Sequence, residues 1–285
     1  MLAFSVSNML WKHPLLSMHN SVVIVYRAGI TGFLFAITFG FFYFYPQAIP
    51  TADLIKPLSN IPWWFWLASI ALCVFSYFGL YYFTNAVQQG KISLVAPLGA
   101  VAQLFGILTA LLAFGETISI TKASASVLFV LSIIQVSYRK GHGITFTKQV
   151  VFIVLSCFFW GISFPLFLFP VREMGVLPFS LLLEITVLVT SLFLVRHNLG
   201  RLDFQLGEFS KYAPIIAVMG LAVYFGVLFN NISLTQIPVS LLITIGLAGE
   251  ALTILYGMLR FKERLSTNEW LAVAWSTVGM AMLYF

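Results

Sequence analysis

The fold is decided by two matching stretches, Phe114-Gly115-Glu116-Thr117-Ile118-Ser119 and Phe261-Lys262-Glu263-Arg264-Leu265-Ser266. They share the pattern Phe-x-Glu-x-Ile/Leu-Ser, lie 147 positions apart, and each follows a long apolar segment. The same offset carries residues of the preceding segment onto counterparts: Gly99, Ala102, Gln103, Gly106 and Ala110 onto Gly246, Gly249, Glu250, Thr253 and Gly257. A hydrophobic chain that repeats itself once is typical of membrane transporters built from two related helical bundles.

The composition indicates a membrane protein. Apolar residues make up 60% of the chain and charged residues 8%, whereas soluble domains carry about 25% charged residues. A helix needs about 20 mostly apolar residues to span a membrane. The sequence offers ten such runs, at roughly 1–17, 20–45, 63–87, 92–114, 120–138, 149–170, 177–195, 212–233, 238–259 and 268–285. These runs are too long and too continuously apolar for β-barrel strands, so we predict an all-α, multi-pass protein of the cell (plasma or inner) membrane.

The most polar connector in the middle of the chain is residues 139–148. It separates a first five-helix repeat, residues 1–138, from a second, residues 149–285. Because each repeat has an odd number of crossings, the second repeat enters the membrane in the opposite orientation. We therefore expect ten transmembrane helices arranged as two inverted repeats.

The basic residues predict how the chain is oriented. Ten crossings leave nine connectors, and eleven of the fifteen Lys and Arg residues fall in the odd-numbered ones. The even-numbered connectors hold Lys56, Lys122 and Arg172. The positive-inside rule therefore places the odd-numbered connectors in the cytoplasm and both termini outside. The first apolar run is short and its helix could be incomplete, but it lacks the features of a signal peptide and we retain it as a helix.

An ionisable residue inside an apolar run is costly and usually functional, and three stand out: Arg27, Glu184 and Glu250. Glu250 and its first-half counterpart Gln103 each lie on a stripe of small residues at helical spacing, which faces a bundle interior. Either they hydrogen-bond to neighbouring helices, or they line a central cavity between the halves, and we favour the cavity. There, Glu250 could carry a coupling proton or pair with a substrate amine.

Arg27 and Glu184 lie near the starts of the second and seventh predicted helices, at roughly matching positions of the two halves. They could form a buried ion pair across the pseudo-symmetry axis. They could instead both lie in the interfacial zone, with their charged ends reaching water. A third alternative is that Arg27 binds a substrate carboxylate.

Asn85 and Asn230 are further candidates for the cavity, although amides near helix ends usually satisfy free backbone groups. Trp11 and Trp160 occupy matching places in the first helix of each half and could shape the cavity wall, or simply pack.

Two acidic residues follow the fourth and ninth predicted helices, and we interpret them as structural. They are Glu116 and Glu263, and the neighbouring Lys262 and Arg264 would neutralise Glu263. Ser266 and Glu269 have the spacing of a capping box for the last helix, and Ser119 is the matching N-cap.

Other functions are disfavoured by what the sequence lacks. Cys73 and Cys157 lie in separate apolar runs and the four His residues have no paired spacing, so neither a disulfide framework nor a metal site is predicted. The basic residues form no stripe for nucleic acid. No phosphate-binding Gly-x-x-x-x-Gly-Lys-Ser/Thr pattern is present, so this chain does not use ATP as its energy source. No cofactor is predicted.

Both halves resemble the EamA-type permease domains of the drug/metabolite transporter superfamily. The resemblance is carried by Trp11 and Trp160, by Pro97 in the fourth helix, and by Glu116 and Glu263 after the fourth and ninth helices. It implies a ten-helix fold whose cavity is lined mainly by the third, fourth, eighth and ninth helices, which favours Asn85, Gln103, Asn230 and Glu250.

Two features depart from the family pattern. Thr244 stands at the second-half position of Pro97. Such permeases are also expected to have both termini in the cytoplasm, opposite to the basic-residue count.

We therefore expect a secondary transporter, not an enzyme, that exports or exchanges a small metabolite such as an amino acid by alternating access. The alternatives are a membrane scaffold without transport activity and a membrane-embedded enzyme. An enzyme would need a cluster of acidic and histidine side chains, which the sequence does not suggest. The substrate, the coupling ion and the oligomeric state are left open by the sequence.

Overall fold

The computed structural model describes residues 2–45, 47, 53–139, 143–236 and 247–283. The side chains of residues 2, 139 and 247–250 fall outside this description. Within it the chain is built from helices, as predicted, together with a hairpin of two short strands. The strands are β1 (Tyr138–Arg139) and β2 (Gly143–Ile144), which pair antiparallel in the predicted central connector.

The helices of the first half follow the predicted runs closely. They are α1 (Leu2–Leu10), α2 (Lys12–Leu15), α3 (Asn20–Phe44), α4 (Trp63–Gln89), α5 (Ile92–Gly99), α6 (Ala102–Phe114) and α7 (Ile120–Ser137), with a short 3-10 turn at Leu58–Asn60. The helices described in the second half are α8 (Lys148–Leu166), α9 (Leu168–Met174), α10 (Val176–Leu199), α11 (Leu206–Gln236), α13 (Leu247–Arg260) and α14 (Thr267–Met282).

Seven stretches of the described chain are helical, apolar and long enough to cross a membrane. They are Asn20–Phe44, Trp63–Gln89, Ile92–Phe114, Ile120–Ser137, Lys148–Met174, Val176–Leu199 and Leu206–Gln236. The three other expected spans are shorter or partly outside the description: the first is divided into α1 and α2, the ninth is described only from residue 247, and α14 has 16 residues. The chain is thus an all-helical, multi-pass membrane protein, and the count of ten stays a prediction.

Two of the predicted continuous spans are interrupted just after a proline. Pro97 lies near the end of α5, and the chain turns at residues 100–101 before α6 begins. Pro165 lies near the end of α8, which gives way to α9 at Phe167. Proline has no N–H for the helical hydrogen bond and its ring clashes with the preceding turn, which bends or ends a helix. The predicted span 212–233 was too short, because α11 begins at Leu206.

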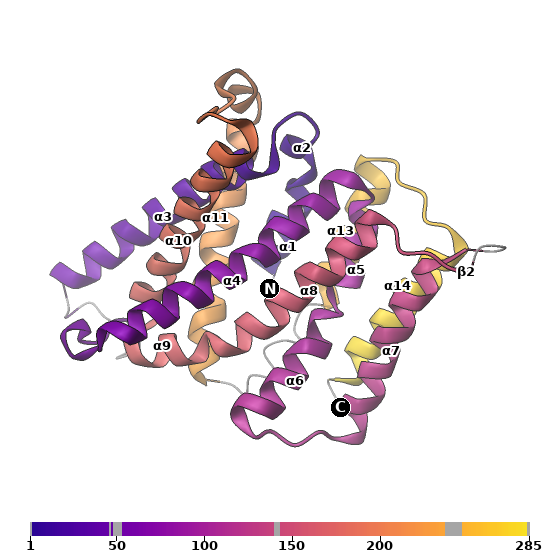
Figure 1. Cartoon of the computed structure of the whole chain (residues 1–285), viewed down its shortest axis with the longest axis horizontal. Coiled ribbons are helices and arrows are strands. Elements are labelled where there is room, and N and C mark those ends of the chain that lie inside the picture. The colour runs from indigo at the N-terminus through magenta and orange to yellow at the C-terminus, as the bar shows by residue number, and fades with distance from the viewer. Residues whose placement is uncertain (1, 46, 48–52, 140–142, 237–246, 284–285) are drawn as a thin grey trace.

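Most of the extensive helix contacts join one half of the chain to the other (Figure 1). Helices α3 and α10 pack side by side toward one end of the long axis, and α7 and α14 do so at the other end. Between them, α4 packs on α8, α1 on α11, α6 on α8, α1 on α13, and α5 on α13. The two halves therefore share one core instead of forming separate bundles.

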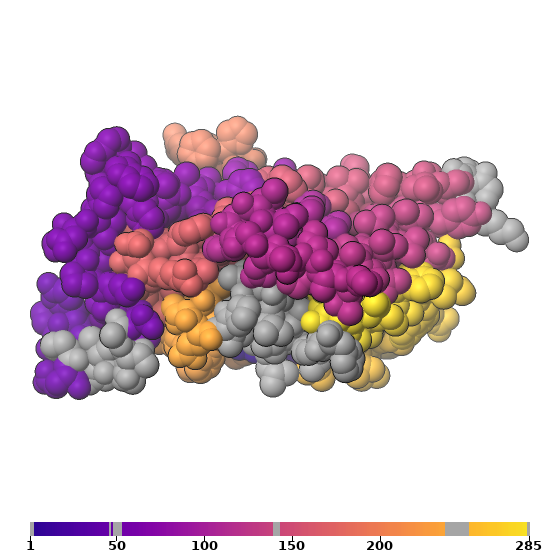
Figure 2. All heavy atoms as spheres, turned by 90° about the horizontal axis from the view of Figure 1, so that it is seen from below, coloured from indigo at the N-terminus to yellow at the C-terminus, as the bar shows by residue number. Residues whose placement is uncertain are grey.

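The connector before α4 is attached to the junction between α9 and α10. The backbone N–H groups of Lys56, Val176 and Leu177 donate to Met174, Asp53 and Leu54 across this contact. Gly175 has φ = 90°, and a Cβ there would lie 3.0 Å from backbone atoms of the connector, so a residue without a side chain is required. Figure 2, seen from below the view of Figure 1, shows the purple connector region against the coral α9–α10 region.

Gly161 brings α8 close to α6. A Cβ at Gly161 would lie 2.4 Å from the carbonyl oxygen of Ala102, a rigid backbone atom. Helices approach this closely only where the contacting residue is small, so Gly161 sets the separation of the two helices beside Trp160.

The variant Gly161→Ala should lower the thermal unfolding midpoint of the purified protein in detergent. Overpacking costs about 1–3 kcal/mol, which corresponds to a decrease of at least about 2 °C. The matched control is Gly29→Ala in the middle of α3, where an added Cβ meets no atom within 4 Å. Because alanine favours a helix over glycine, Gly29→Ala should unfold no earlier than the parent. Equal midpoints for the two variants would contradict the close packing of α8 on α6.

Candidate functional site

Residues of both halves of the chain line a cavity of about 300 Å³. The first half contributes residues of α1, α3, α4, α5 and α6, and the second half residues of α8, α10, α11, α13 and α14. Its position between the halves follows from the packing, because α1, α4, α8 and α11 each contact a helix of the opposite half there.

Three aromatic rings form one wall of the cavity. Trp11, at the junction of α1 and α2, lies edge-on to Phe83 of α4 with ring centroids 6.4 Å apart. Trp160 of α8 also contacts Phe83, with a centroid separation of 5.3 Å. All three rings line the cavity. The two tryptophans that the sequence places at matching positions therefore contact the same phenylalanine.

Some of the other residues predicted from the sequence line the cavity, and some do not. Gln103 on α6 is buried and lines the cavity, and Asn230 on α11 also lines it. Asn85 is not among the lining residues, and its amide donates to the carbonyl of Tyr81 one turn earlier in α4. Glu250 belongs to the first turn of α13, but its side chain lies outside the described part of the chain, as does Thr244.

Several polar residues of the cavity were missed by the sequence reasoning. They are Asn8, Ser76, Ser156, Asn231 and Thr253. Asn231 is buried and donates to the hydroxyl of Ser180 at 2.9 Å, and Ser156 donates to the carbonyl of Gly79 at 2.9 Å. A signal existed for two of them: Asn231 follows Asn230, and Thr253 was placed on the stripe of Glu250.

Arg27 and Glu184 form a buried ion pair at the edge of the cavity. The guanidinium Nη1 of Arg27, on α3, lies 2.8 and 2.7 Å from the two carboxylate oxygens of Glu184, on α10. The side chains are 4% and 3% exposed, which excludes the alternative that both reach the membrane interface. The Nε of Arg27 is buried without a hydrogen-bond partner, so the pair does not use all the donors of the guanidinium.

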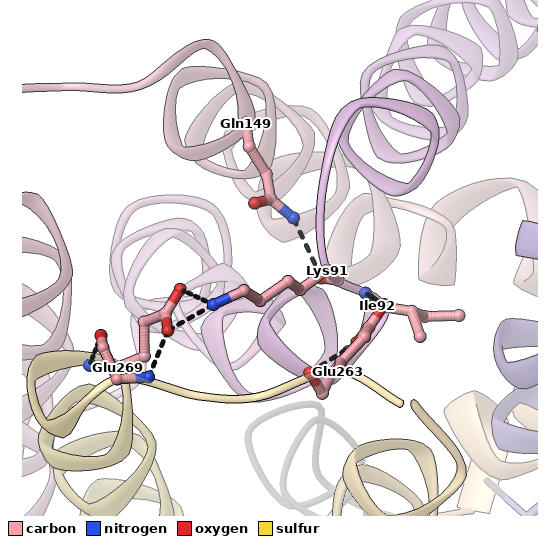
Figure 3. Close-up of polar contacts among 7 residues, drawn as sticks. Lys91, Ile92, Gln149, Glu263 and Glu269 are labelled. Carbon is pink, nitrogen blue, oxygen red and sulfur yellow. Dashed lines mark hydrogen bonds and ion pairs between the residues drawn. The ribbon is translucent and has the colours of Figure 1, made fainter. Parts of the chain in front are cut away.

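A group of charged contacts joins the two halves at the end of the molecule that carries the odd-numbered connectors (Figure 3). We call it the interlock, and its residues are Lys12, Lys91, Ser93, Glu263 and Glu269. Lys12 pairs with Glu263, and Lys91 pairs with Glu269 at 2.8 and 2.7 Å. Gln149, at the start of α8, donates to the carbonyl of Lys91 at 2.9 Å.

Glu263 also binds the beginning of α5. Its carboxylate accepts from the N–H groups of Ile92 and Ser93 at 3.0 and 2.9 Å, and from the Ser93 hydroxyl at 2.6 Å. Burial raises the pKa of Glu263, but the hydrogen bonds from Lys12, Ser93 and Ile92 outweigh it, so the pKa lies below the ordinary glutamate value. The cation paired with Glu263 is thus Lys12 and not, as predicted, Lys262 or Arg264. The neighbouring residues were an unreliable guide because Lys12 lies 251 residues away.

The predicted helix caps are confirmed. Ser266 and Glu269 form a reciprocal capping box at the start of α14. The Ser119 side chain accepts from the N–H of Lys122 at the start of α7. Glu116 pairs with Lys122 at 3.3 Å, which gives it a local structural contact.

The fold and the cavity define a multi-pass membrane protein with a cavity between two halves. The model of the EamA-like transporter family matches residues 147–285. This family is part of the drug/metabolite transporter superfamily, so the match supports the resemblance seen in the sequence for the second half of the chain. Proteins of this family are generally membrane transporters.

Solved structures extend the likeness to the fold of the whole chain. A structure titled only "Crystal structure of protein" matches with a TM-score of 0.63, covering 99% of this chain and 94% of its own. The two sequences are 15% identical, so the match shows the fold alone. No curated protein matches the chain.

Removing one partner of the buried ion pair should destabilise the protein strongly. Glu184→Gln leaves an unpaired guanidinium in an apolar region, and such changes cost about 3–5 kcal/mol. The double variant Arg27→Met/Glu184→Met should recover most of the loss in thermal unfolding midpoint measured in detergent. The control is Asp203→Asn in the exposed Arg201–Asp203 pair, which should leave the midpoint nearly unchanged. A double variant no more stable than Glu184→Gln would show that the pair is not the source of the loss.

Proposed function

We propose that the protein is a secondary transporter that carries a small metabolite through the central cavity by alternating access of its two halves. The observation that carries this proposal is the cavity itself, which lies between the halves and combines aromatic walls with amide and hydroxyl groups. Pockets of this type bind small molecules, with apolar surfaces for affinity and a few polar groups for orientation. A cavity at the contact between two halves is also where rocking motions change access.

The ten-helix, inverted-repeat arrangement is part of the proposal. In a two-fold arrangement, each helix–helix contact should have a counterpart in which the two halves are exchanged. The expected equivalents, in chain order, are α1–α2 with α8–α9, α3 with α10, α4 with α11, α5–α6 with the segment ending in α13, and α7 with α14. The packing of α4 on α8 then corresponds to α11 on α1, and α6 on α8 corresponds to α13 on α1. The pairs α3–α10 and α7–α14 map onto themselves, and α3 on α11 corresponds to α10 on α4. This reciprocity supports a two-fold relation between the halves.

The size and chemistry of the cavity favour a small amphipathic substrate such as an amino acid. A volume of about 300 Å³ is at the lower limit of ordinary ligand pockets. The Trp11–Phe83–Trp160 wall can contact an apolar group, while Gln103 and Asn230 offer amides to polar groups. We propose export or exchange as the direction. A scaffold without transport activity is the alternative that the flux measurement below tests.

Transport should depend on the cavity residues. In proteoliposomes preloaded with radiolabelled amino acids, Gln103→Leu should reduce flux about fivefold, because a substrate hydrogen bond is worth about 1 kcal/mol. Trp160→Ala should reduce it at least as much by removing one side of the wall. Matched controls are Gln135→Leu, whose amide contacts Asn268 on α14, and Trp270→Ala, a partly exposed residue of α14.

Both control variants should retain parental flux. Absence of flux in the parent protein, with amino acids and with a broader metabolite extract, would favour the scaffold alternative. Parental flux in Gln103→Leu and Trp160→Ala would instead remove the cavity from the transport path.

Glu250 is proposed as the proton-carrying residue. Glu250→Gln keeps the side-chain size and removes the ionisable group, so flux should be lost or should no longer depend on pH. The measurement is flux at pH 6 and pH 8 with the folded state checked by gel filtration. Unchanged flux with the parental pH dependence would remove Glu250 from the mechanism.

A further inference from the structure

We propose that Glu263 is the positioning residue that holds the cavity closed at the odd-connector end, and that the interlock must open once in every transport cycle. The inference rests on the proposed transport function. It names residues that neither the sequence nor the cavity lining assigned to the site.

The carboxylate of Glu263 binds several groups at once. Glu263 binds the N–H groups of Ile92 and Ser93, the Ser93 hydroxyl and the ammonium of Lys12. Charge-assisted bonds of this kind are about twice as strong as neutral ones. A carboxylate at a helix N-terminus is also favoured by the helix dipole. Glu263 is therefore bound simultaneously to the start of α5 and to the start of α2.

The contacts of the interlock join opposite halves of the chain. Glu263 and Glu269 lie after the central connector, whereas Lys12, Lys91 and Ser93 lie before it. Two further contacts also join the two halves. The Nε2 of His13 lies 2.6 Å from the hydroxyl of Tyr256, and the ammonium of Lys12 lies 5.1 Å from the ring centroid of Phe261. A relative movement of the halves at this end must break the Lys12–Glu263 and Lys91–Glu269 pairs.

The cavity lies on the inner side of the interlock. Toward this end its lining reaches Trp11 at the junction of α1 and α2, Phe83 on α4, Val95 on α5 and Thr253 on α13, and it includes none of the interlock residues. Leu94, between Val95 and the interlock residue Ser93, is 3% exposed. A packed layer thus closes this end of the cavity, and the interlock lies on its outer side.

The two repeats differ at the positions that form the interlock. The counterpart of Glu263 is Glu116, which pairs with Lys122 six residues away on the first turn of α7. The position that matches Lys12 in the second half is Gly161, which has no side chain to supply an ammonium. The protein should therefore favour the state that is closed at the odd-connector end. Loss of the interlock should shift the population toward the state that is open there.

Accessibility of a cavity cysteine tests this directly. In a Cys73→Ser/Cys157→Ser background, Ala96→Cys places a thiol on the cavity wall of α5. Sealed vesicles of both orientations are treated with a membrane-impermeant maleimide. A separate Leu202→Cys variant, half exposed in the connector after α10, identifies the vesicles whose odd-connector face is accessible.

From that face, Ala96→Cys should react slowly in the parent. Glu263→Gln and Lys12→Met should each increase the rate on the order of tenfold, because each removes a partner of a charge-assisted bond. If Glu263→Gln does not fold, Lys12→Met and Ser93→Ala carry the test. Two controls should react at the parental rate: Glu116→Gln, the repeat counterpart, and Lys211→Met, whose partner Glu208 lies three residues away on the same helix.

Unchanged labelling in folded Glu263→Gln, or in Lys12→Met and Ser93→Ala together, would overturn the proposal. So would an equal increase in Glu116→Gln, which would remove the asymmetry. Labelling needs no substrate, so it tests the interlock independently of the proposed transport function. Faster labelling with no flux for any metabolite would refute transport and leave the interlock, whereas unchanged labelling with normal flux would refute the interlock alone.

Discussion

The structure depends on one constraint: in an apolar surrounding, polar groups must find their partners inside the protein. In a chain with 60% apolar residues, many of the buried hydroxyl groups donate to a carbonyl of their own helix, and others bind across the two halves, as Ser156 does to the carbonyl of Gly79. Arg27 and Glu184 illustrate the constraint, because neither charge could be buried at that position alone. The same surface that satisfies these groups contains the cavity. Stability and the candidate function are therefore located in the same contact between halves.

Backbone features then determine the shape of this contact. The prolines of α5 and α8 interrupt two long helices, so that each enters the shared core as two shorter pieces. Gly161 allows α8 and α6 to approach until only a glycine fits. This approach places Trp160 opposite Phe83, and Trp11 completes the wall from the other half. The aromatic wall is thus a consequence of close helix packing and not of a local motif.

Charges outside the apolar spans have a different role. They are concentrated in the odd-numbered connectors, where the sequence predicts orientation from their number. In the folded chain some of them bind across the halves, and Glu263 accepts hydrogen bonds from two first-half segments. The residues that suggest which side faces the cytoplasm therefore also include those proposed to control access from that side. A difference between the repeats, Lys12 against Gly161, is what makes the two ends unequal.

The sequence by itself determined the elements that depend on neighbouring residues: the helical class, the caps at Ser119 and Ser266, the family resemblance of the second half, and ten apolar runs, seven of which are found as helices long enough to cross a membrane. Helical spacing placed Gln103 on an inward-facing stripe, and the repeat placed Trp11 and Trp160 at matching positions; all three line the cavity. Only the tertiary structure decided which inward faces meet. It placed Asn85 outside the cavity lining and Asn231 within it, and it paired Glu263 with Lys12 across 251 residues. Helical spacing defines a face, but the partner of that face depends on the packing of distant helices, which no local pattern records.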